Sequence, residues 1–175
     1  MRKLELLVRF VGVAACWIFI PGQILVSIFH IFGRQLFKFS GTPLQELEWH
    51  FFVALIFLTF GLAYLSDRHV RIDVLREKSS APTRSAIEIA GFFLSPLPFC
   101  MVTIYFGADY AWQAFEIGER SRAALGLPSR WIIKSVVPLG AFFLLMACIV
   151  VTAGQIRTLQ RSSLINQKVN KRQRS

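Results

Sequence analysis

The sequence is poor in charged side chains, and in acidic ones above all. Of its 175 residues 17% are charged, with 10 Asp plus Glu against 20 Lys plus Arg. A soluble domain usually carries about 25% charged residues. Together with 54% hydrophobic residues and 17 phenylalanines, this deficit predicts that a lipid bilayer surrounds most of the chain. The net charge of +10 then fits a basic rim beside anionic headgroups, and we expect no nucleic-acid partner.

Cysteine is also scarce, which excludes a disulfide framework. Cys16, Cys100 and Cys148 all lie inside apolar runs, and no CxxC or Cys/His metal spacing occurs. We therefore interpret the three thiols as small buried hydrophobic side chains and expect no metal and no cofactor.

Four apolar runs are present, at residues 6–32, 49–66, 87–115 and 131–154. At about 1.5 Å per residue the second run reaches about 27 Å and the other three exceed a hydrocarbon core of about 30 Å. All four can therefore cross a membrane, and the first and third are too long to stand upright. Pro21, Pro96, Pro98 and Pro138 lie inside these runs and predict bends. Residues 34–48 contain Gly41 and Pro43 and are expected to form a loop outside the membrane. The predicted fold is an all-α integral membrane protein with four tilted or kinked transmembrane helices in a domain spanning residues 1–154.

The distribution of Lys and Arg predicts the orientation. The N-terminal flank, the connection after the second run and the segment 155–175 together hold 14 of these residues, whereas the other two connections hold 5. Because cytoplasmic flanks are rich in Lys and Arg, we expect both termini in the cytoplasm, with 155–175 as a basic cytoplasmic tail.

The middles of all four runs lack ionisable side chains. A transporter that works alone needs an ion or substrate site near the membrane midplane, so this absence argues against a self-sufficient pump. An alternative uses His30 and His50, which end the first run and begin the second. Two such histidines facing each other would suit a haem-binding four-helix membrane anchor of an oxidoreductase.

Several short motifs point to one family. "HVRID" (69–73) follows the second run, "LQELEWHFF" (44–52) enters it, Arg34 follows the first run, and "GLPSRWIIKSVVPLG" (126–140) enters the fourth. In this order and spacing they resemble the small membrane subunit of tripartite ATP-independent periplasmic (TRAP) transporters. On these motifs we place a set of structural or partner-contacting residues: Arg34, Glu46, Trp49, His50, His69, Arg71, Asp73, Trp131 and Lys134.

The resemblance implies a bacterial inner-membrane protein that is not an enzyme. In that family a soluble periplasmic protein captures an organic anion, and a large membrane subunit carries it inward with sodium ions. The small four-helix subunit would form a stable heterodimer with the large one, stiffen its scaffold and help to dock the binding protein. The substrate is not specified.

Two charged segments remain open to two interpretations each. Arg71 and Asp73 either brace a partner subunit on the cytoplasmic side or, with their basic neighbours, only hold the second run against the inner leaflet. Glu116, Glu119, Arg120 and Arg122 lie between the third and fourth runs. They form either a docking site for the binding protein or an ordinary solvated loop.

Overall fold

The computed structural model describes residues 1–37, 41–66, 81–123 and 126–174. The regular secondary structure within these ranges is helical: α1 (Arg2–Phe37), α2 (Thr42–Leu65), α4 (Ala81–Leu94), α5 (Pro96–Glu116) and α6 (Trp131–Arg174). Four stretches within them are long and apolar enough to cross a membrane, at Arg2–Leu36, Thr42–Leu65, Ser85–Glu116 and Trp131–Gln160. The predicted all-α architecture with four spans is therefore confirmed.

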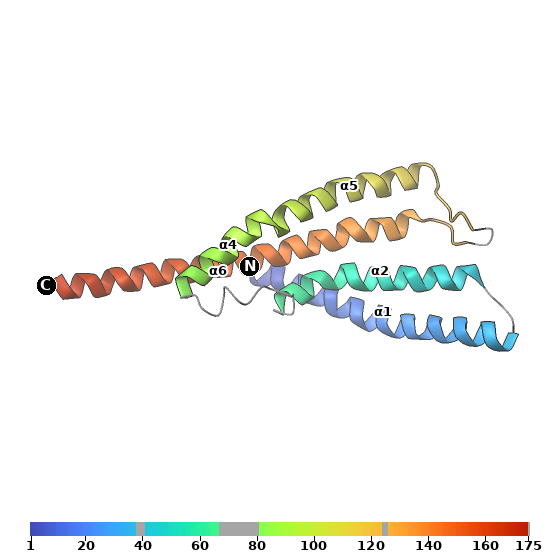
Figure 1. Ribbon diagram of the computed structural model, residues 1–175, viewed down its shortest axis with the longest axis horizontal. Coiled ribbons are helices and arrows are strands. Elements are labelled where there is room, and N and C mark those ends of the chain that lie inside the picture. The colour runs from blue at the N-terminus through green and yellow to red at the C-terminus, as the bar shows by residue number, and fades with distance from the viewer. Residues whose placement is uncertain (38–40, 67–80, 124–125, 175) are drawn as a thin grey trace.

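The helices lie in a row. α1 packs against α2, α2 against α6, and α6 against α4 and α5, in the order that Figure 1 shows. α6 is the most enclosed helix, because 39% of its most apolar stretch is buried against 11% in each of the other three spans. The exposed side chains of α1 and α5 are largely apolar, including Trp17 and Tyr105, as expected of surfaces that face lipid or another membrane subunit.

Both termini lie at one end of the row, together with the end of α2 and the start of α4 (Figure 1). The opposite end carries the end of α1, the start of α2 and residues 117–123 and 126–130 between α5 and α6, and we call it the loop end. Successive spans therefore run in alternating directions, as the span count requires.

The third span bends where its prolines predict. α4 ends at Leu94 and α5 begins at Pro96, with Ser95 between them at φ −124° and ψ −70°. The Ser95 amide still donates to the Gly91 carbonyl at 3.0 Å, but Pro96 has no amide hydrogen to continue the ladder. By contrast, Pro21 and Pro138 lie inside continuous helices.

The expected loop at 34–48 is wrong. Helix α1 continues to Phe37 and α2 already begins at Thr42, so Arg34, Glu46 and Glu48 are all helical. The reason is that Gly41 caps α2 and a proline stands in its first turn, where the missing amide hydrogen costs nothing. The basic segment 155–174 is also helical, as a continuation of α6, because no Gly or Pro interrupts it.

Two glycines allow the backbones of α2 and α6 to approach closely. A Cβ on Gly61 of α2 would lie 2.8 Å from the Phe143 carbonyl oxygen, and a Cβ on Gly140 of α6 would lie 2.5 Å from that of Phe57. These reciprocal glycines bring the two backbones into contact. Cys100 and Cys148 are fully buried in a cluster with Phe92 and Leu144, as predicted for small core residues. Cys16, predicted to be buried as well, is only partly buried on α1.

Candidate functional site

Glu46, in the second turn of α2, holds the segment between α5 and α6. Its carboxylate accepts a hydrogen bond from the Ser121 hydroxyl, and its second oxygen accepts the Leu127 amide at 2.7 Å. Gly126 is required here because a side chain at that position would overlap Ser121 and lie 3.0 Å from Glu46 Oε1. The carboxylate therefore ties a segment some 75 residues away in sequence onto the start of α2.

The same segment is also closed on itself. The Ser121 amide donates to the Leu127 carbonyl at 3.2 Å, and the Arg130 amide donates to the Glu119 carbonyl at 3.1 Å. Gly118, at φ +58°, lets the chain turn out of α5 in a conformation that other residues rarely adopt. Residues 118–123 and 126–130 thus leave and re-enter the helices through defined backbone contacts.

Lys134, in the first turn of α6, fixes the base of this segment. Its ammonium is bonded to the Glu119 carboxylate and lies 3.6 Å from the centroid of the Tyr110 ring. The side chain of Lys134 is only 13% exposed, so its charge is neutralised by contacts within the protein. Next to it the Trp131 ring meets Phe115 edge-on, with centroids 5.3 Å apart.

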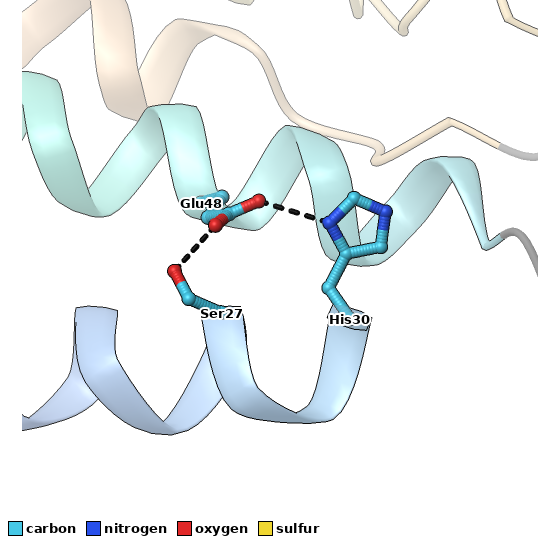
Figure 2. A network of polar contacts seen from close by, with 3 residues as sticks. All are labelled: Ser27, His30 and Glu48. Carbon is cyan, nitrogen blue, oxygen red and sulfur yellow. Dashed lines mark hydrogen bonds and ion pairs between the residues drawn. The ribbon is translucent and has the colours of Figure 1, made fainter. Parts of the chain in front are cut away.

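A second polar cluster joins α1 to α2 at the loop end (Figure 2). Glu48 accepts hydrogen bonds from the Ser27 hydroxyl and from His30 Nδ1, the latter at 3.0 Å. Residues two apart on a helix point about 200° away from each other, so Glu46 and Glu48 serve opposite neighbours of α2. The sequence reasoning missed Glu48 and Ser27. One signal could have found them: Ser27 and His30 are three residues apart and so lie on one face of α1.

The remaining predicted residues at this end are more exposed. Arg34, Arg120 and Arg122 are exposed, and none makes a hydrogen bond or ion pair with any residue that the structure describes. Glu116 accepts a hydrogen bond from Trp112 Nε1 at 2.9 Å. Trp49 is 64% exposed beside a cavity of about 300 Å³ that His30 and Glu48 also line.

The two histidines do not support the haem alternative. His30 binds Glu48 in the cavity between α1 and α2, whereas His50 donates from Nδ1 to the Glu46 carbonyl at 2.5 Å and lines a different cavity beside α6. They therefore do not face each other across a shared space. Among the described ranges no group of three His, Cys, Asp or Glu side chains is placed to hold a metal ion. His69, Arg71 and Asp73 lie outside the described residues.

The chain was compared with known proteins. No curated protein sequence matches it. A family model matches residues 23–158, and its description is the DctQ component of tripartite ATP-independent periplasmic transporters. The matched segment covers most of the chain, begins within α1 and ends within α6, and contains every residue of the two clusters described above. The chain therefore belongs to the DctQ family, the small membrane component of TRAP transporters.

Proposed function

We propose that the chain stabilises the large transport subunit in the bacterial inner membrane and helps to dock the periplasmic binding protein during sodium-driven uptake of an organic acid. As a DctQ component it is one part of a three-part system with those two proteins. It catalyses no reaction in this proposal, and both of its termini lie in the cytoplasm.

The observation that carries this proposal is the fixed segment at the loop end. Glu46 of α2 and Lys134 of α6 hold Glu119, Ser121 and Leu127, and Lys134 also contacts Tyr110 of α5. A segment that only connected two spans would need no such anchoring. A partner that docks and leaves in every cycle, however, requires a surface that is already in position when it arrives.

The scaffold role is supported by the arrangement of the helices. A single row buries few residues outside α6 and leaves two broad apolar faces, which lipid and the large subunit can share. The segment 69–73 is retained as a proposed brace for that subunit. If Arg71 and Asp73 contact it, R71A and D73A will lower the yield of intact complex from detergent, and wild-type yields for both would leave only the membrane-anchoring interpretation.

Reconstitution into liposomes tests the proposal. We expect the chain alone to take up no organic acid, with or without a sodium gradient, because its span centres hold no ionisable group. Uptake should require the large subunit, the binding protein and sodium together, and replacing sodium by potassium is the matched control. Sodium-dependent uptake by this chain alone, or full uptake without it, would refute the proposal.

A further inference from the structure

At the loop end the fold gives the acidic side chains partners within the protein and leaves two arginines without one among the described residues, which the sequence alone does not reveal. Glu116, Glu119, Arg120 and Arg122 include acids and bases, but both acids bind other side chains of the protein. Glu119 binds Lys134, Glu116 accepts from Trp112, and Glu46 accepts from Ser121 and Leu127. The two bases that remain, Arg120 and Arg122, are exposed and pair with no described residue. The two charges that residues 119–123 offer to the surroundings are therefore both cationic, while Glu116, exposed at the end of α5, keeps its negative charge.

The backbone that carries these arginines is held on both sides. Arg120 stands between Glu119, whose carboxylate binds Lys134 and whose carbonyl accepts the Arg130 amide, and Ser121, whose hydroxyl binds Glu46. Arg122 follows directly, and the next amide, that of Ala123, donates back to the Ser121 hydroxyl at 3.3 Å. Both guanidinium groups thus start from backbone positions that α2 and α6 fix.

We propose that Arg120 and Arg122 form a recognition point for a carboxylate-bearing surface of the soluble binding protein, and that Glu46 positions them. This rests on the docking role proposed above and names its chemistry. A guanidinium presents paired N–H donors that match a carboxylate. The phosphate of an anionic lipid would match as well, but a fluid headgroup needs no fixed receptor, whereas a folded partner gains from one. The anchoring of residues 119–123 therefore favours the protein.

The first test measures uptake against binding-protein concentration for the complete transporter in neutral liposomes. The variant R120E/R122E should raise the half-saturating concentration about tenfold at ~50 mM salt, since steering by charge changes association rates by about 10- to 1,000-fold. At ~500 mM salt the increase should fall below about threefold, because the screening length has dropped well under ~8 Å. The matched control R120K/R122K keeps the charge and should stay close to wild type.

The second test separates positioning from charge. Glu46→Gln keeps the size of the side chain but removes the anion that two donors share, and Ser121→Ala removes one of the two contacts. Both variants leave the charges of Arg120 and Arg122 in place and disturb their position, so both should raise the half-saturating concentration by about threefold or more, at low and at high salt. Because Glu46 acts through the arginines, combining E46Q with R120E/R122E should add little to the loss caused by the arginine reversal alone.

The possible results are distinct. If uptake by the wild-type transporter does not depend on the binding protein, the proposed function itself fails. If it does depend on it, but the curves of wild type and R120E/R122E coincide, only the present inference is overturned. It is also overturned if the reversal dissociates the large subunit, or if its effect appears only in liposomes containing anionic phosphatidylglycerol, which would assign the arginines to assembly or to lipid.

Discussion

The close contact between α2 and α6 gives a prediction that can be worked from the structure. Gly140 of α6 faces the backbone of Phe57, and a Cβ at this position would lie 2.5 Å from the Phe57 carbonyl oxygen and 2.7 Å from its carbonyl carbon. The atoms it would meet belong to the backbone of a neighbouring helix. A rotamer change cannot relieve the overlap, so Gly140→Ala forces the two helices apart.

The size of the effect follows from the distances. Ordinary van der Waals contact begins at 3.4 Å, so the Cβ requires a displacement of about 0.9 Å. Overpacking of this kind costs about 1–3 kcal/mol. The higher helix propensity of alanine offsets up to about 1 kcal/mol of this loss of stability. Because backbone atoms move aside less easily than a side chain does, we take the upper overpacking cost of about 3 kcal/mol. Less the gain of about 1 kcal/mol in helix propensity, we expect Gly140→Ala to lower the free energy of unfolding by about 2 kcal/mol.

Gly154 on the same helix is the matched control, because a Cβ there would meet nothing within 4 Å. Gly154→Ala should therefore leave stability unchanged or raise it by up to about 1 kcal/mol. Denaturant unfolding of the purified chain in mixed micelles, followed by helix content, measures both variants against wild type. If Gly140→Ala is as stable as Gly154→Ala, the close approach of α2 and α6 is not a feature of the folded protein.

Two further predictions address the α1–α2 cluster and the orientation. Glu48→Ala removes the acceptor of both Ser27 and His30 and should lower the free energy of unfolding by about 1–3 kcal/mol. Glu48→Gln should recover part of this loss, and an unchanged stability of Glu48→Ala would show that the cluster does not hold α1. In a cysteine-free background, a thiol at Arg122 should react with an impermeant reagent added from the periplasm, whereas one at Lys3 should react only after the membrane is opened. The reverse pattern would invert the proposed orientation.

The spans could be predicted from the sequence because the lipid environment restricts the backbone conformation of a long apolar run. A run of about 20 apolar residues must be helical, since no water is present to satisfy its backbone groups. The bend at Ser95 was predictable for an equally local reason, the prolines that follow it. The ends of the helices were not, because the residues near them are polar. Arg34, Glu46 and Glu48 suggested a loop, yet all three are helical, and the two glutamates bind side chains and an amide of other elements.

The candidate site illustrates the same limit. The family resemblance singled out Glu46 and Lys134 as structural residues, and the structure gives each a defined partner. No sequence pattern predicts that Glu46 meets Ser121, because the two are joined only when α2, α5 and α6 assemble. For the same reason, the sequence does not show that Glu119 pairs with Lys134 whereas Arg120 and Arg122 are exposed. Residue types are local, but their pairing is a property of the packed helices.

The position of α2 in the row explains why the loop end behaves as one unit. Glu48 on one side of this helix binds α1, and Glu46 on the other side binds the segment between α5 and α6. Further along, the glycine contacts press α2 against α6. In a row, each helix touches mainly its neighbours, so a displacement of α1 reaches Ser121 and Leu127 chiefly through α2. In the proposed docking role, this fixes the arginine pair relative to the whole row, and hence relative to any large subunit that binds its apolar faces.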